Sequence, residues 1–178
     1  MKTAPEVAII GGGPCGSFTA LNLAKRGIDV AVFEEHKEVG VPCHCPGHVS
    51  IEGLRKLGLA PLPKEVVENT FRGACFHSPA GETFEVNFSS PITCTVNRTL
   101  FDKHIAGLAE EAGARFCLDS HVESLITEKG RVEGVLVKQN GKIAKVSAKI
   151  VIDAEGISSK LLKQAGLPAP NRNFIVNG

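Results

Sequence analysis

The sequence predicts an α/β fold in which a parallel sheet carries helices and antiparallel β-rich insertions. Two observations support this prediction. Near the N-terminus, a short apolar run is followed by a glycine-rich turn, a segment of helical periodicity and a second apolar run. Further along the chain, strand-like and helical patterns alternate, and Asn140-Gly141 is a strong signal for a hairpin turn.

The N-terminal unit consists of a strand, a turn, a helix and a second strand. Residues 6–10 form the first predicted strand, and residues 14–26 have apolar residues at the spacing of a helix packed on a sheet. Gly27 is expected to end this helix. Residues 29–33 form the second predicted strand, with Glu34 at its end.

The turn at residues 11–16, GGGPCG, has the G-x-G-x-x-G spacing of a dinucleotide-binding turn. Gly11 permits a tight turn, Gly13 lets a diphosphate approach the backbone, and Gly16 lets the helix pack against the strand. The helix N-terminus offers N–H groups to the phosphates. Glu34 can accept hydrogen bonds from ribose hydroxyls and disfavours a 2′-phosphate. The unit therefore predicts a Rossmann-like site for FAD or NAD, and the motif alone does not choose between them.

The rest of the chain contains further helices and strands. One helical pattern covers residues 48–60, with Ser50 as a candidate cap. A second covers residues 98–112, with Asn97 as its cap, and a short helix is expected over residues 158–165. The predicted strands are 71–78 and 83–88, joined as a hairpin by the turn PAGE, and then 92–96, 115–118, 120–127, 131–138 and 143–152.

Composition and charge limit the classes of protein that fit. The 178 residues are enough for one core, and the formal net charge of +1 gives no strong attraction to nucleic acid. No apolar run approaches the roughly 20 residues that span a bilayer, and the N-terminal run is too short for a signal peptide. The six cysteines lack the spacing of a secreted disulfide framework. We therefore expect a protein of a reducing, cytoplasmic compartment.

Three further patterns, together with the glycine turn, resemble those of known flavoenzymes. The glycine turn, an R-x-x-F-D-x-x-I pattern from Arg98 and a D-A-x-G-x-x-S pattern from Asp153 resemble the FAD-dependent monooxygenase and reductase superfamily. The segment EVGVPCHCPGHVSIEGLRKLGL, residues 38–59, resembles the geranylgeranyl reductase family, which includes archaeal lipid reductases. The resemblance implies FAD as the cofactor. It also implies a glutathione-reductase-type, monooxygenase-like FAD-binding domain over residues 1–178, with a β-rich insertion at 71–96.

The resemblance also implies which part of FAD each residue would contact. The glycine turn would surround the diphosphate, and Glu34 would bind the adenosine ribose. Arg98 would contact the phosphates or the ribityl chain, and Val122 would present its backbone to the adenine. The loop after the second strand would reach the flavin, with Cys45 near its reactive face as the candidate catalytic residue. The complete predicted cofactor set is Gly11, Gly13, Pro14, Cys15, Gly16, Glu34, Cys45, Pro46, Gly47, His48, Arg98, Val122, Asp153 and Gly156.

The cysteine loop at residues 43–48 has other interpretations. It holds the residue types of a zinc site, but its C-x-C spacing lacks the usual C-x2-C grip and no second ligand pair follows, so no metal is expected. A redox pair between Cys43 and Cys45 would be strained. The cysteines could also merely pack in a turn.

Other candidate residues have structural alternatives too. Arg98 could be a solvated residue at a helix start, and Glu34 could be a solvated acid at a strand end. Asp153 could be the cap of the helical region at Ser158 or of a turn. The sequence also departs from the family pattern at two places. Residues 46–48 stand where relatives have small or acidic residues, and Glu155 stands where relatives have Asp.

The function implied by the resemblance is reduction of the isoprenoid double bonds of a prenyl lipid, with hydride from reduced flavin and a proton for the other carbon. The electron donor, NAD(P)H or ferredoxin, is left open. A lipid substrate implies peripheral contact with a membrane. Family members continue well beyond Gly178, with another Gly-Asp FAD motif and most of the isoprenoid-binding domain. We therefore expect the N-terminal portion of such an enzyme, either a truncated gene product or one part of a split protein that a partner chain completes. Two alternatives are a monooxygenase or halogenase-like enzyme, and a non-catalytic FAD- or NAD-binding module that needs a partner chain.

Overall fold

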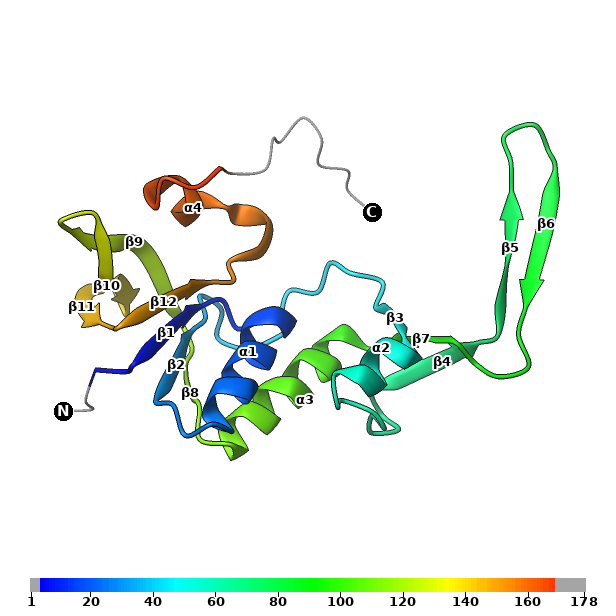
Figure 1. Ribbon diagram of the computed structural model, residues 1–178, viewed down its shortest axis with the longest axis horizontal. Helices are drawn as coiled ribbons and strands as arrows, with labels where there is room; N and C mark the ends of the chain where they lie inside the picture. Colours follow the sequence, from blue (N-terminus) through cyan, green and yellow to red (C-terminus); the bar gives the residue numbers. More distant parts are fainter. Residues whose placement is uncertain (1–3, 169–178) are drawn as a thin grey trace. The chain divides into compact units, whose positions relative to one another are not determined.

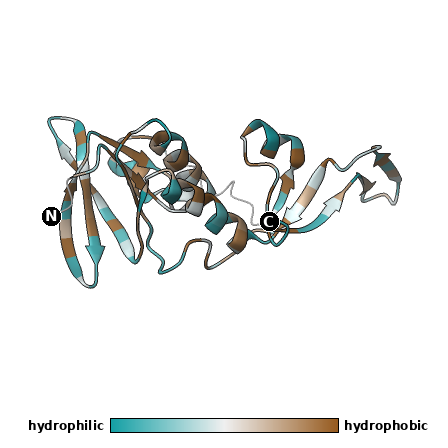
Figure 2. Cartoon of the chain, turned by 90° about the horizontal axis from the view of Figure 1, so that it is seen from below, coloured by the Kyte–Doolittle hydropathy of each residue, from teal (hydrophilic) through white to brown (hydrophobic). Residues whose placement is uncertain are grey.

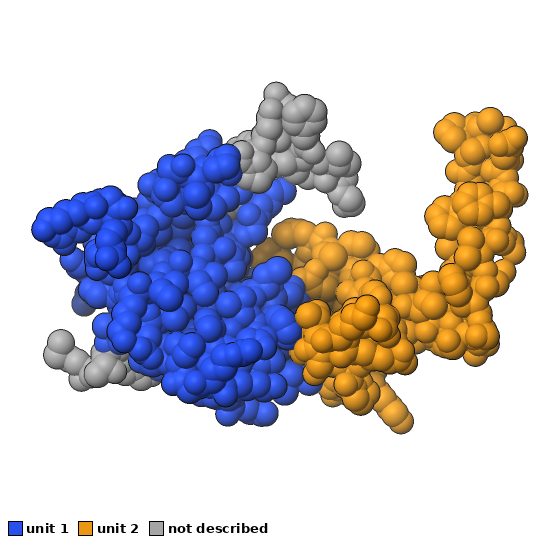
Figure 3. Space-filling model, viewed as in Figure 1, with its two compact units in different colours: residues 1–41, 102–178 blue, residues 42–101 orange. Residues whose placement is uncertain are grey.

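The computed structural model describes residues 4–168, which form two compact units (Figure 3). Of these residues, 4–41 and 102–168 belong to the first unit and 42–101 belong to the second. Residues 71–96, for which the sequence predicts a β-rich insertion, lie within the second unit.

The first unit contains a parallel sheet of four strands, as the sequence predicts. The strands β1 (Val7–Ile10), β2 (Val30–Phe33), β8 (Arg115–Cys117) and β12 (Ile150–Asp153) lie in the order β12-β1-β2-β8 (Figure 1). Because β1 and β2 are buried along their whole length, each is a continuous apolar run in the sequence. From β1 the chain passes to β2 on one side, whereas β12 lies on the other side of β1. The strand order therefore reverses next to β1, and ligands of such sheets bind at this reversal, outside the carboxyl ends of the strands.

Helix α1 (Pro14–Ala24) connects β1 to β2, and its buried residues include Ala20, Leu21 and Ala24. The helix ends two residues before the predicted limit. Gly27 follows with a φ of +76°, and its N–H donates to the carbonyl oxygen of Ala24 at 2.8 Å. This positive φ explains why glycine stands at the helix end.

An antiparallel ribbon packs on the parallel sheet. Its strands are β9 (Ser120–Glu128), β10 (Arg131–Gln139) and β11 (Lys142–Ser147), and the predicted Asn140-Gly141 turn joins the last two. The side chains of Val122, Val135 and Val137 enter one core with those of β1 and β2. The predicted strand 143–152 is two strands, because the chain leaves the ribbon near residue 148 and joins the parallel sheet as β12.

The 3₁₀ turn η1 (Gly156–Ser158) and helix α4 (Lys160–Gln164) follow β12, where the sequence predicts one short helix. Ser159, between the two elements, has a φ of +49°, so the predicted helix is interrupted there.

The second unit contains a small sheet and a separate hairpin. The strands β3 (His48–Ser50), β7 (Thr93–Val96) and β4 (Val67–Phe71) pair in the order β3-β7-β4. The hairpin consists of β5 (Gly73–His77) and β6 (Thr83–Asn87), as predicted. Polar and apolar residues alternate along β6, TFEVN, and Figure 2 colours the chain by hydropathy. Strand β4 was not predicted.

Two helices accompany these strands. Helix α2 (Ile51–Lys56) is shorter than predicted, because residues 48–50 pair with β7, and the Ser50 hydroxyl caps it by accepting the N–H of Gly53. Helix α3 (Arg98–Glu111) begins after Asn97, whose side chain accepts the N–H of Leu100 at 3.1 Å. Both predicted caps are therefore confirmed.

Candidate cofactor site

The glycine turn lies between β1 and α1, and its three motif glycines meet different surroundings. Gly11 has a φ of +97°, and a Cβ there would lie 2.5 Å from the carbonyl oxygen of Ala154. A Cβ on Gly16 would lie 1.9 Å from the carbonyl oxygen of Gly11. A Cβ on Gly13 would meet no atom within 4 Å. The fold itself therefore requires glycine at the outer two positions, whereas Gly13 borders open space that a ligand can enter.

The N-terminus of α1 faces the same turn. Gly13 is its N-cap residue, Pro14 follows at the first helical position, and no side chain caps the helix. The first turn holds no acidic residue. An 11-residue helix with such an N-terminus presents backbone N–H groups and a partial positive charge to an anion.

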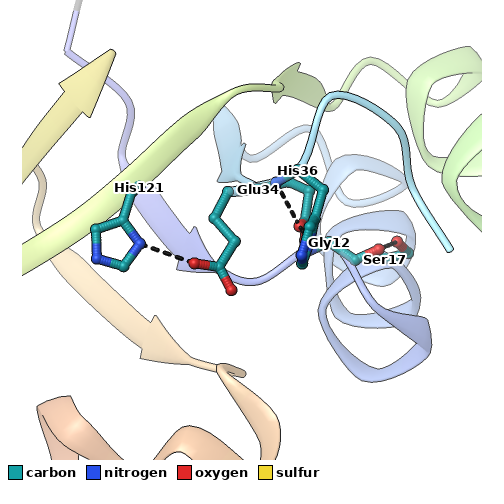
Figure 4. A network of polar contacts seen from close by, with 6 residues as sticks. Gly12, Ser17, Glu34, His36 and His121 are labelled. Atoms are coloured by element: carbon teal, nitrogen blue, oxygen red, sulfur yellow. Dashed lines mark hydrogen bonds and ion pairs between the residues drawn. The ribbon is translucent and has the colours of Figure 1, made fainter. Parts of the chain in front are cut away.

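Glu34 follows β2 and is only 8% exposed, so it is not the solvated acid considered above. The N–H of Gly12 donates to its Oε2 at 2.6 Å (Figure 4). Its Oε1 accepts the N–H of His36 at 3.0 Å and lies 2.6 Å from the Nδ1 of the same residue. The Ser17 hydroxyl donates to the carbonyl oxygen of Gly12 at 2.8 Å. These bonds attach the carboxylate to the glycine turn.

Backbone hydrogen bonds also fix the segment that follows β2. The N–H of Glu34 donates to the carbonyl oxygen of Cys117 at 3.0 Å, and the N–H of Ser120 donates to the carbonyl oxygen of Glu34 at 2.8 Å. The N–H of Asp119 donates to the carbonyl oxygen of His36 at 2.9 Å. The connection between β8 and β9 thus holds residues 34–36 in place.

Asp153 ends β12, beside Ile10 of β1. Its Oδ1 accepts the N–H of Glu155 at 3.0 Å, which is the turn-capping role considered above. Its Oδ2 is buried and has no hydrogen-bond partner. Burial, with a smaller contribution from the nearby Glu155 carboxylate, raises the pKa of the Asp153 carboxyl. Glu155 in turn accepts the N–H of Leu161 at 2.8 Å, so this departure from the family pattern serves the α4 segment.

Val122 is buried on β9, and its side chain packs in the core of the first unit. Successive residues of a strand direct their N–H groups to opposite edges. Because the N–H of Ser120 bonds to Glu34, the N–H of Val122 lies on the same edge, away from β10.

The remaining candidate residues belong to the second unit. Gly47 has a φ of +74°, and a Cβ there would lie 2.2 Å from the carbonyl oxygen of Val96 and 3.3 Å from Cγ of Arg98. The loop end and the start of α3 are therefore packed together. His48 Nε2 lies 2.8 Å from the Thr93 hydroxyl, and its ring meets Phe71 edge-on.

The cysteines of the loop are exposed. Cys43 and Cys45 are not joined by a disulfide, and the Cys43 thiol lies 3.6 Å from the carbonyl oxygen of Cys45. Within residues 4–168, no group of three or more His, Cys, Asp or Glu side chains is arranged to hold a metal ion. The loop thus keeps two accessible thiols, of which Cys45 is the predicted catalytic residue.

Comparison with known proteins identifies the domain. The model of a family described as "FAD binding domain" matches residues 4–177. The chain belongs to this FAD-binding family. Its cofactor is therefore FAD, which the glycine motif alone left open against NAD, and its α/β fold is the predicted one.

Similar proteins are named for lipid reduction. Digeranylgeranylglycerophospholipid reductase 2 of Methanopyrus kandleri is 35% identical over 91% of this chain, and the reductase of that name from Methanocella arvoryzae is 32% identical over 94%. A solved geranylgeranyl bacteriochlorophyll reductase-like protein from Thermoplasma acidophilum is 31% identical over 92% of this chain, with a TM-score of 0.86. The match covers 40%, 43% and 42% of these three proteins respectively, so the chain spans about two fifths of their length. A flavin-dependent brominase, 28% identical with a TM-score of 0.75, shares the fold over 90% of this chain and 41% of its own.

The structure brings the predicted residues together in two groups. In the first unit, residues 11–16, Glu34 and Asp153–Gly156 surround the carboxyl ends of β1, β2 and β12, and in the second unit Gly47 packs on Arg98. Sequence reasoning missed Gly12, Ser17 and His36. The sequence signal for Gly12 is its place as the middle glycine of the GGG run. In the structure, a Cβ at Gly12 would lie 3.1 Å from the Cβ of Glu34, so the two residues pack closely.

Proposed function

We propose that this chain is the FAD-binding part of an oxidoreductase that reduces isoprenoid double bonds of a prenyl lipid. One observation carries the proposal: the open turn at Gly13, with the Glu34 carboxylate fastened beside it, occurs in a chain whose curated relatives are named digeranylgeranylglycerophospholipid reductases. Because the chain spans about two fifths of those relatives, the lipid substrate is inferred from their names.

The residues of the first unit fit FAD. A diphosphate would lie at Gly13 and the N-terminus of α1, where no side chain blocks the backbone. Glu34 would accept a ribose hydroxyl, and the outward edge of Val122 would face the adenine. The partnerless Oδ2 of Asp153 lies on a strand next to the glycine turn and would gain a hydrogen bond from the cofactor or from a water held with it.

When bound, FAD supplies the two-electron chemistry of the reaction. The protein residues position it and its substrate. Arg98 would bind an anionic part of the cofactor, because its guanidinium stays charged. Gly47, packed on Arg98, would fix the end of the loop that carries Cys45, whose exposed thiol we propose lies toward the flavin.

A lipid substrate calls for contact with a membrane surface, and we propose such contact as peripheral. None of the helices in the described part of the chain has the length and apolar character needed to cross a bilayer. Phe76 and Phe84 support the proposal, because their rings stack on one face of the β5–β6 hairpin and are 49% and 61% exposed. We also propose that activity requires the part of the relatives that this chain does not match, whether it is a continuation or a partner chain.

The test of this function is direct. The chain is purified together with the continuation or partner chain that supplies the part of the relatives it does not match. FAD is added, excess is removed, the bound flavin is reduced with dithionite, and a geranylgeranyl lipid is supplied. We expect the lipid to gain two hydrogens in mass for each reduced double bond. An unchanged lipid, together with an oxygen- or halide-dependent product from an aromatic substrate, would instead favour the monooxygenase or halogenase alternative, to which the brominase relative lends some support.

A further inference from the structure

We infer that His36 is the positioning residue of the cofactor site, and that it orients Glu34 toward the adenosine ribose. The inference rests on the FAD site proposed above and assigns a role to a residue outside the glycine motif. Its starting point is the contact between His36 Nδ1 and Glu34 Oε1 at 2.6 Å, shorter than most nitrogen–oxygen hydrogen bonds (Figure 4).

The contact has a defined direction. A carboxylate only accepts hydrogen bonds, so the proton between the two groups lies on Nδ1 of the ring. A carboxylate offers about four acceptor sites. The N–H of Gly12, the N–H of His36 and the ring of His36 use three of them. The carboxylate is thus held from both sides and still has room for one more donor, such as a ribose hydroxyl.

The backbone around His36 is fixed before any ligand binds. Its carbonyl oxygen accepts the N–H of Asp119, and two residues earlier Glu34 is bonded through both its N–H and its carbonyl oxygen. The side chain of His36 is 46% exposed, whereas that of Glu34 is 11% exposed. The ring therefore covers the carboxylate from the solvent side while its own backbone stays in place.

A second histidine–carboxylate pair lies close by and provides a matched control. His121 Nδ1 lies 2.9 Å from Glu35 Oε2, and its side chain is 45% exposed, but Glu35 is itself 56% exposed. Within residues 4–168, Glu35 makes no hydrogen bond to the glycine turn. Removing the His121 ring should therefore leave FAD affinity unchanged.

The experiment measures FAD affinity by quenching of flavin fluorescence. We expect His36→Ala to weaken binding about five- to tenfold, less than the value of one direct hydrogen bond to a charged group, because His36 acts on FAD only through Glu34. His36→Asn should restore most of the loss, because its amide nitrogen is attached to Cγ as Nδ1 is. His36→Gln, whose amide lies one bond further out, should restore less. His121→Ala should match the wild type.

A double-mutant cycle with Glu34→Gln tests whether His36 acts through Glu34. We expect the effect of His36→Ala to disappear in the Glu34→Gln background. In the cofactor-free protein, ¹⁵N NMR of the His36 ring should show the proton on Nδ1.

Three outcomes would overturn the role of His36 alone: unchanged affinity in His36→Ala, a loss that persists in the Glu34→Gln background, or a ring with a bare Nδ1. Failure of the wild-type chain to bind any FAD would overturn the cofactor site as well. The two failures are thus distinguished by the wild-type titration.

Discussion

The two acids that end the strands on either side of β1 have opposite surroundings. Glu34 follows β2 and accepts three hydrogen bonds from Gly12 and His36. Asp153 ends β12 and has one bond, to the N–H of Glu155, while its second oxygen is buried without a partner. The first site aims three hydrogen-bond donors at its carboxylate before a ligand arrives. The second disfavours the charge, which the raised pKa of Asp153 reflects.

The comparison shows that position on the sheet does not decide how an acid is used. Both residues lie at the carboxyl edge, where parallel sheets bind ligands. What differs is the number of donors that the neighbouring loops aim at each carboxylate. A preorganised acceptor suits a ribose hydroxyl, whereas a partnerless oxygen suits a group that brings its own donor.

The largest expected effect comes from removing the better-satisfied acid. Glu34→Ala should destabilise the protein by about 2 kcal/mol, because it leaves the buried N–H of Gly12 and the ring of His36 without their acceptor. Thermal or urea unfolding measures this loss. The control is Glu35→Ala at the adjacent exposed position, which should change stability by less than about 0.5 kcal/mol. Equal losses in the two variants would contradict the contrast drawn here.

Replacing the second acid, Asp153, should raise the stability of the protein rather than lower it. The folded-state pKa of Asp153 is raised above its unfolded value, so its contribution to stability is fully present below the unfolded pKa and is lost as pH rises through the folded pKa. Asp153→Asn should therefore raise the stability of the cofactor-free protein at neutral pH, by less than about 1 kcal/mol because the group is only partly buried. Unfolding measured at pH 4 and pH 8 checks this: the gain should appear at pH 8 and vanish at pH 4. A destabilised variant at pH 8 would refute it.

The smallest effect should come from the other end of the same strands. Glu6 and Lys149 precede β1 and β12, and their side chains form an exposed ion pair at 2.6 Å. The bond to Lys149 lowers the pKa of the Glu6 carboxyl, so any stability it provides is present above the unfolded pKa and lost as pH falls through the folded one. Because water screens this pair, Lys149→Met should leave the unfolding midpoint unchanged. A clear shift of the midpoint would mean that polar contacts at the amino edge of the sheet contribute to stability as those at the carboxyl edge do.

Much of this arrangement is legible in the sequence, and the reasons are local. The strand–turn–helix–strand order, the caps Ser50 and Asn97 and the Asn140-Gly141 hairpin all follow from neighbouring residues. Strand β4 (Val67–Phe71) could not be foreseen, because its mostly exposed residues VENTF show little apolar pattern and it forms by pairing with the distant β7.

The candidate site also contains some features that the sequence predicts and others that it does not. The roles of Gly11 and Gly16 in the turn follow from spacing alone. The bond between His36 and Glu34 does not, because the connection between β8 and β9, more than 80 residues away in sequence, holds their backbone in place. No single-sequence pattern reports such a contact.

The central claim is that the open space at Gly13 receives the diphosphate of FAD. Equilibrium binding of FAD to Gly13→Val tests it most directly, with Gly107→Val as the control, since a Cβ at either glycine meets no atom within 4 Å. We expect Gly13→Val to fold and to bind FAD at least about tenfold more weakly than the wild type, a difference of about 1.4 kcal/mol, while Gly107→Val binds normally. Wild-type affinity in the Gly13 variant would contradict the account.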